Sequence, residues 1–156
     1  MDALLRQKLE SAQEECAMHL KRMSYAHGNI RAFLPTDATR LSQLNDEQIE
    51  ALDQYLYRFT KLQDAMGQRL FKHSLAWLAE DVRSMAFIDQ LNQLEKLGAI
   101  ESAQTWLELR KLRNLLAHEY ASDDAEKASA INLVFGHYQT MAAMLERFNQ
   151  YLAARQ

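Results

Sequence analysis

The stretch "NDEQIEALDQYLYRFTKLQDAMGQRLF" (residues 45–71) decides the fold class of this chain. It opens with Asn45 and carries Gln48 three positions later, which is the spacing of a capping box at a helix N-terminus. The pattern predicts one long amphipathic helix from about Asn45 to about Asp81, because apolar residues recur there at steps of three and four. These apolar residues are Leu52, Leu56, Phe59, Met66, Leu70 and Trp77.

Gly67 falls in the middle of this predicted helix. A glycine there costs roughly 1 kcal/mol relative to alanine. One interpretation is a tolerated defect or a slight bend. The other is the close approach of a second helix, either within the bundle or across a dimer interface.

Four more helices follow from the same period. The first ends before Pro35 and carries Leu5, Leu9, Ala12, Cys16, Leu20, Met23 and Ile30, and residues 35–45 form a connection. A short helix then holds Phe87, Leu91 and Leu94, with Gly98 as its C′ residue. The next begins at a Ser102 cap and runs through Tyr120. The last opens with an Asp123–Glu126 capping box and carries Ile131, Phe135, Tyr138, Leu145, Phe148 and Leu152. The sequence therefore predicts an all-α, up-and-down bundle of about five helices.

Composition supports one helical domain over residues 1–156. The chain is 48% hydrophobic and 25% charged, in the ordinary globular range. A chain of this length is long enough to bury a hydrophobic core without disulfides or a structural metal. It has one proline and four glycines, which are too few turn-forming residues for a many-stranded β fold.

The N-terminus and the single cysteine indicate a reducing, cytoplasmic setting. "MDALLRQKLE" is charged throughout, and no apolar run approaches the roughly 20 residues of a membrane span. Cys16 lies on an apolar stripe, so we expect a small buried hydrophobe. The net charge of −3 excludes a strongly basic nucleic-acid binder and restricts any RNA contact to a local patch.

No metal or cofactor site is expected. The chain has no HExxH, CxxC or glycine-rich phosphate loop, and it lacks the Gly-Ser and Asp-x-Asp pattern of nucleotidyltransferases. The histidines outside residues 113–120 are not at metal-ligand spacing. His73 shares a stripe with Phe59, Met66 and Leu70, which favours a satisfied core histidine.

Residues 113–120, "RNLLAHEY", bring together side chains that core packing does not require. On a helical wheel the core stripe is Leu109, Leu112 and Leu116. A second stripe beside it holds Trp106, Arg110, Arg113, Ala117 and Tyr120. His118 points about 140° from Arg113 on a regular helix. The two would meet if the helix frays near Ala117, or if a second copy supplies the facing half of a cleft.

Arg113 and His118 suit phosphodiester cleavage without a metal. A histidine near its ordinary pKa takes or gives a proton at physiological pH, from a ribose 2′-hydroxyl or to the leaving oxygen. An arginine would stabilise charge developing on phosphorus. Asn114 would orient the substrate or a neighbouring loop, and Tyr120 would stack on a base or bond a phosphate. Spacing alone leaves open a surface arginine and a half-buried, satisfied histidine.

"LRKLRNLLAHEY" resembles the Arg-x4-His-x-Tyr signature of HEPN-domain proteins, and in particular the HepT-like toxins, which carry Arg-Asn-x-x-x-His-x-Tyr. The match falls on Arg113, Asn114, His118 and Tyr120 without a gap. Residues 57–71 and 87–100 also look like that family, whereas the N-terminal third and the last helix match only in being helical.

This resemblance implies an all-α homodimer whose two motifs line a shared cleft. It implies a toxin that is a metal-independent ribonuclease, with Arg113 and His118 catalytic and with Asn114, Tyr120 and Arg110 positioning the RNA. It further implies a minimal nucleotidyltransferase antitoxin, which in some pairs attaches AMP to the motif tyrosine, here Tyr120.

Two other functions stay open. The chain would alternatively be a non-catalytic nucleotide- or substrate-binding subunit of a minimal nucleotidyltransferase, or a plain dimeric helical adaptor. Four basic residues follow the second predicted helix, namely Arg58, Lys61, Arg69 and Lys72. They form either a solvated face or a phosphate-binding strip that Arg110, Lys111 and Arg113 complete.

Overall fold

The computed structural model describes residues 2–78, 81, 83–117 and 123–155. Over these residues the chain forms helices and no β-strand, which confirms the all-α prediction. The elements are α1 (Ala3–Ile30), α2 (Ala38–Ser42), α3 (Asp46–Ala65), the π-helical turn η1 (Met66–Leu70), α4 (Phe71–Trp77), α5 (Phe87–Leu97), α6 (Ala103–Ala117), α7 (Asp124–Gly136) and α8 (Tyr138–Ala153).

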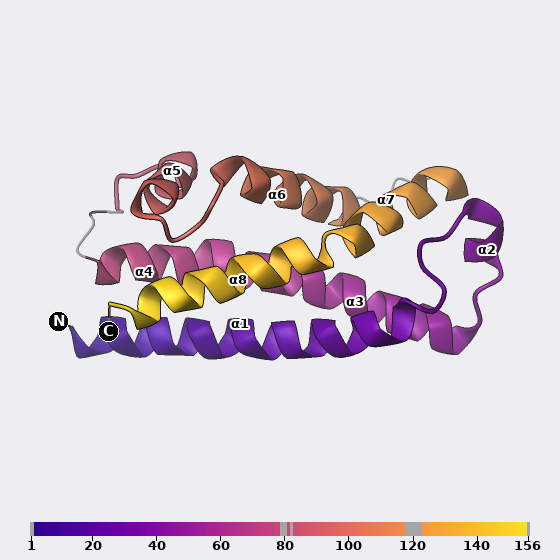
Figure 1. Ribbon diagram of the computed structural model, residues 1–156, viewed down its shortest axis with the longest axis horizontal. Coiled ribbons are helices and arrows are strands. Elements are labelled where there is room, and N and C mark those ends of the chain that lie inside the picture. The colour runs from indigo at the N-terminus through magenta and orange to yellow at the C-terminus, as the bar shows by residue number, and fades with distance from the viewer. Residues whose placement is uncertain (1, 79–80, 82, 118–122, 156) are drawn as a thin grey trace.

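Four long passes along the molecule make up the bundle. Figure 1 shows α1 running one way, α3 with α4 returning, α6 running out again and α7 with α8 coming back, so that both termini lie at one end. The shorter α2 and α5 lie toward opposite ends of the molecule. This arrangement confirms the predicted up-and-down topology.

Local capping sets several of the helix ends where the sequence predicted them. Asn45 and Gln48 form the reciprocal capping box at the start of α3, with both bonds at 2.9 Å. Gly98 ends α5 in the left-handed region at φ 85°, which glycine adopts without strain. Ser102 accepts from the Thr105 N–H at 3.1 Å and so begins α6.

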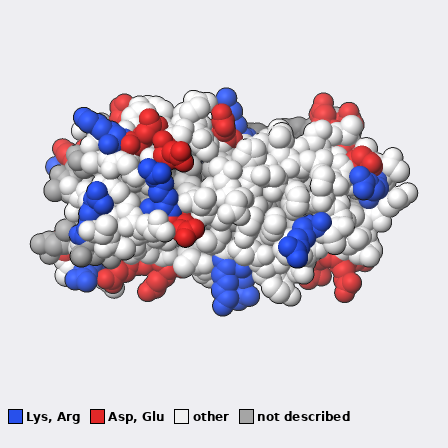
Figure 2. Space-filling view, viewed as in Figure 1, with Lys and Arg blue, Asp and Glu red and all other residues white. Residues whose placement is uncertain are grey.

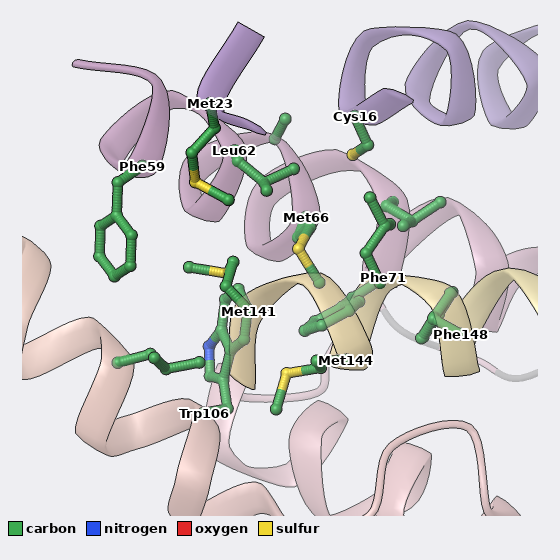
Figure 3. Packing of buried hydrophobic residues seen from close by; sticks show 14 of the residues in the cluster. Cys16, Met23, Phe59, Leu62, Met66, Phe71, Trp106, Met141, Met144 and Phe148 are labelled. Atoms are coloured by element: carbon green, nitrogen blue, oxygen red, sulfur yellow. The ribbon is translucent and has the colours of Figure 1, made fainter. Parts of the chain in front are cut away.

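One continuous apolar core fills the space between the passes, and its centre is aromatic. Figure 3 shows Trp106 of α6 among side chains of α3, α4 and α8. Its ring centroid lies 4.7 Å from that of Phe71, which lies 5.0 Å from that of Phe148. Trp106 is fully buried. The wheel placed it on the second stripe, with Arg110 and Arg113, beside the core stripe, and the core covers this position of α6 as well as Leu109.

Gly67 accommodates the Trp106 indole. An added Cβ at Gly67 would lie 2.9 Å from Cζ2 of Trp106, closer than such contacts occur. The close approach of a second helix is therefore the correct interpretation, and that helix, α6, belongs to the same chain. The surrounding turn, η1, is π-helical, so the long helix predicted from residue 45 is continuous but locally widened. It ends at Trp77 rather than near Asp81.

The last predicted helix is in fact two helices. His137 has φ −97° and ψ 8°, outside the helical region, and separates α7 from α8. Gly136 precedes it and has the lower helix propensity of glycine. The His27 ring of α1 stacks on Tyr138 at 3.9 Å and on Phe135 at 5.2 Å, so the break lets both aromatic rings pack against His27.

Asp123 caps the N-terminus of α7, because its side chain accepts from the Ala125 N–H at 2.8 Å.

The connection predicted over residues 35–45 contains the short α2. Asp37 accepts from the Arg40 N–H at 2.8 Å and caps it. The Asn132 amide of α7 ties the chain just before α2, because it accepts from the Thr36 N–H at 2.9 Å and donates to the Thr36 carbonyl at 2.8 Å.

Cys16 is fully buried in the core, as predicted. Burial is the main reason that its thiol pKa rises to about 12. No helix among the described residues is long and apolar enough to cross a membrane.

Candidate active site around Arg113

Helix α6 carries the first half of the Arg-x4-His-x-Tyr motif, and packing fixes its rotation. Trp106 and Leu109 are fully buried, whereas Leu112 and Leu116 are only partly covered. The apolar residues therefore anchor the N-terminal part of α6 most firmly. Arg113 lies one turn beyond Leu109, at the edge of the core.

Arg113 is held by Asp64 of α3 in a two-point ion pair. The Nε donates to Oδ1 and the Nη2 donates to Oδ2, each at 3.0 Å. The two side chains are 27% and 22% exposed, so water screens the pair only in part. A fork of this kind fixes the plane of the guanidinium as well as its position.

Asp64 binds one edge of the Arg113 guanidinium. The hydrogen bond with Asp64, with a smaller contribution from its negative charge, raises the pKa of Arg113 against the opposing effect of burial. Asp64 accepts from Nε and Nη2. A guanidinium has five N–H donors, and the residues that the structure describes accept from Arg113 only through Asp64, so among them the Nη1 donors and the second N–H of Nη2 have no partner. These donors form the second fork of the group, which matches two oxygens of a phosphate.

The contact between Gly67 and Trp106 lies beside the Arg113–Asp64 pair and joins the same two helical segments. Gly67 follows Asp64 by three residues, and Trp106 precedes Arg113 by seven, about two helical turns. The Gly67–Trp106 contact and the ion pair thus join the α3–η1 pass to α6 at two successive places. Two such contacts fix the rotation of α6, and with it the direction of Arg113.

The other polar residues predicted on α6 lie in different surroundings. The Arg110 guanidinium carbon lies 5.5 Å from the centroid of the Phe87 ring, a cation–π contact with α5. Asn114 is exposed, and no described residue bonds its side chain. The structure therefore does not bring Arg110 and Asn114 together with Arg113 through any direct bond among the described residues.

His118 and Tyr120, the second half of the motif, lie outside the described residues. Their predicted roles as proton-transfer group and as positioning or modified residue stay predictions. The described part of the motif is Arg113 and Asn114 on the last turns of α6.

Two of the four basic residues along α3 to α4 face α1 rather than solvent alone. Arg58 bonds Nδ1 of His19 at 3.0 Å and contacts the Met18 sulfur at 3.2 Å. Arg69 pairs with Glu15 and also donates to the Ser11 hydroxyl at 3.3 Å. These bonds place Arg58 in the contact of α1 with α3 and Arg69 in the contact of α1 with η1, which was not one of the two predicted outcomes.

Two histidines, one in α1 and one in α4, lie near these arginines. His19 is 6% exposed, and its pKa is lowered chiefly by burial, against the hydrogen bond that it donates to the Glu15 carboxylate, which raises it. His73 is half-buried at the edge of the core, which is less enclosed than predicted. Burial and the charges of Arg69, Lys8 and Lys72 lower its pKa. The described residues hold no group of three or more metal-ligating side chains.

Asp64 is the site residue that the sequence analysis missed. A signal was present, because Asp64 is the one acidic residue between Asp53 and Glu80 in a stretch with several cations. It also follows Lys61 by three residues and so lies on the same side of the helix. Only the packing of α6 identifies Arg113 as its partner.

Charge is mixed over the face of the molecule seen in Figure 1. Figure 2 shows lysine and arginine side chains interspersed with aspartate and glutamate on that face, without one continuous positive field. Since the net charge is −3, a phosphate-binding surface has to be local, such as the surroundings of Arg113.

Comparison of the chain with protein-family models, with curated proteins and with solved structures finds no match.

Proposed function

We propose that this protein is a metal-independent endoribonuclease of the HepT-like toxin type, with a HEPN-like bundle. The observation that supports it most is Arg113, which Asp64 holds and which forms no other bond to a residue that the structure describes, five residues before His118 in the sequence. A charged, oriented fork with a histidine nearby in sequence suits phosphoryl transfer in RNA.

In the proposed reaction, His118 takes the proton from a ribose 2′-hydroxyl. The 2′-oxygen bonds to the adjacent phosphorus, and the bond from phosphorus to the 5′-oxygen breaks. The leaving 5′-oxygen is protonated by the His118 of a second copy in a homodimer. Arg113 stabilises the charge that develops on the phosphate oxygens. The products would be a 2′,3′-cyclic phosphate and a 5′-hydroxyl end.

The direct test is cleavage of single-stranded RNA by the purified chain in EDTA. Replacing the 2′-hydroxyls of the same oligonucleotide with hydrogen should abolish cleavage, because the attacking group is then gone. A chain that degrades the DNA version equally well would contradict the proposed chemistry.

We propose that a minimal nucleotidyltransferase antitoxin silences the enzyme in the cytoplasm by attaching AMP to Tyr120. The added phosphate would pair with Arg113 and occupy the position that an RNA phosphate needs. Intact-mass spectrometry after co-expression with such a transferase tests this step. An AMP-sized addition that Tyr120→Phe removes is expected, and an addition that persists in Tyr120→Phe contradicts it.

A second candidate is a non-catalytic nucleotide-binding subunit of the transferase. The observation that favours it is also the Arg113–Asp64 pair, because an arginine that already has a carboxylate partner serves well as a structural link between α3 and α6. In that case the purified chain would cleave no RNA, and Arg113→Ala would lower stability alone.

A further inference from the structure

Tyr57 on α3 is an exposed aromatic side chain with two cations beside its ring. It is 53% exposed. The Arg58 guanidinium carbon lies 5.3 Å from the ring centroid and the Lys61 Nζ lies 5.6 Å from it. An open ring beside positive charge is the combination with which proteins bind single-stranded nucleic acid, since the ring stacks on a base and the cation meets a phosphate.

The two cations at this ring differ in how firmly they are held. Arg58 is anchored to α1 through His19 and Met18, which holds its guanidinium in place near the ring. Lys61 is exposed and forms no ion pair with any carboxylate of the described residues. Its ammonium therefore remains available to an anion.

Helical geometry places Tyr57 and Lys61 on the same side of α3 as Asp64. The three residues follow one another at steps of four and three, which are neighbours on a helix surface. At 1.5 Å per residue, Tyr57 lies about 10 Å along the axis from Asp64. Because Asp64 holds Arg113, a single face of α3 leads from the exposed ring, past Lys61, to the Arg113 guanidinium.

The cationic part of this face ends at Tyr57. One and two turns closer to the start of α3 come Asp53 and Glu50, both exposed and acidic. Glu47 and Glu50 also line an open groove of about 530 Å³ between α1 and α3, together with Tyr25 and Phe33. Phosphates would be repelled there. The favourable path for a phosphate chain is therefore short and runs from Tyr57 to Arg113.

We propose that Tyr57 and Lys61 form a subsite for one unpaired nucleotide beside the phosphate that Arg113 holds. Tyr57 stacks on the base, and Lys61 pairs with the phosphate between that base and Arg113. The proposal rests on the proposed ribonuclease function and adds its substrate class, since only an unpaired base exposes a face for stacking. Single-stranded RNA is bound, and duplex RNA is not bound at this ring.

Fluorescence anisotropy with an uncleavable 2′-O-methyl RNA oligonucleotide tests the subsite without relying on catalysis. Tyr57→Ala should raise Kd about tenfold, as expected for the loss of one stacked base, while Tyr57→Phe should retain wild-type Kd. Lys61→Gln should lower the dependence of log Kd on log salt by about 0.7. Tyr57→Leu retains apolar bulk, so a raised Kd in this variant shows that the flat ring is needed.

Two exposed residues elsewhere on the bundle provide matched controls. Tyr25 is 68% exposed beside the acidic groove, and Lys21 is an exposed lysine of α1. Tyr25→Ala and Lys21→Gln should leave Kd and its salt dependence unchanged. The proposal is overturned if Tyr57→Ala and Tyr25→Ala give the same Kd, if Tyr57→Ala weakens duplex binding equally, or if the wild type binds no oligonucleotide.

The outcome separates this subsite from the proposed chemistry. A chain that binds single-stranded RNA through Tyr57 but does not cleave RNA supports the subsite and contradicts the nuclease. A chain that cleaves RNA with unchanged binding in Tyr57→Ala supports the nuclease and overturns the subsite.

Discussion

Asp64 and Arg113, 49 residues apart in the chain, meet through two hydrogen bonds of 3.0 Å between α3 and α6. The pair lies where the motif helix leaves the core, so one contact links fold stability to the candidate site. Removing either side chain would leave its partner partly buried without its counter-ion, which costs more than the loss of a surface pair.

A double-mutant cycle of Asp64→Ala and Arg113→Ala should give a coupling free energy of about 1–2 kcal/mol in urea unfolding. This value lies between those of exposed and fully buried ion pairs, in keeping with the partial burial of both side chains. The control is the Arg6–Glu10 pair of α1, whose side chains are 68% and 55% exposed, and it should show much weaker coupling. Equal coupling in the two cycles would mean that Asp64 does not hold Arg113 in solution.

Gly67→Ala should destabilise the protein by about 1–3 kcal/mol, although alanine normally favours a helix. The reason is that the new Cβ would lie 2.9 Å from the Trp106 indole, which is fully buried, so the packing around it would have to shift. Thermal or urea unfolding measures the change.

Gly28→Ala in α1 is the matched control for this prediction, because no side chain or distant backbone atom lies within 4 Å of its added Cβ. It should stabilise the protein by up to about 1 kcal/mol. The two substitutions should therefore have opposite signs, and a stabilising Gly67→Ala would contradict the packing described for Trp106.

Stability should fall as the pH drops from about 7 to 5, and His27 should account for part of the loss. Burial, and then the charge of Arg31, lowers its pKa below the ordinary 6.5. The unfolded chain therefore binds the proton more readily, so the contribution is complete above about pH 6.5 and is lost below it. His27→Phe keeps a ring to stack on Tyr138 and removes the proton site. Urea midpoints across this pH range should fall less in His27→Phe, and an identical fall would exclude His27 as a source.

The sequence allowed the helices and their ends to be predicted where the cause is local. The caps formed by Asn45 with Gln48, by Gly98 and by Ser102 each involve only residues close in sequence. They can therefore be predicted without a tertiary structure. The steps of three and four likewise predicted which faces would be buried. Leu52, Phe59 and Leu70 all lie in the core as expected.

Features that depend on partners distant in the chain were not predictable in the same way. The break at His137 is stabilised by His27, which is 110 residues away in the sequence. The role of Asp64 depends on which helix packs across from it. The full burial of Trp106, on the stripe beside the predicted core stripe, was not predicted, because a helical wheel gives the direction of a side chain but not the width of the face that its neighbours cover.

Cleavage of RNA in EDTA by Arg113→Ala, compared with the wild type, tests the central claim most directly. With helical circular dichroism unchanged, the single-turnover rate should fall about 100-fold or more in Arg113→Ala, and His118→Ala should fall comparably. Arg113→Lys should also be defective, because lysine retains the charge but lacks the fork that binds Asp64 and phosphate together. Cleavage at the wild-type rate by Arg113→Ala, or loss of wild-type cleavage on adding EDTA, would contradict the account.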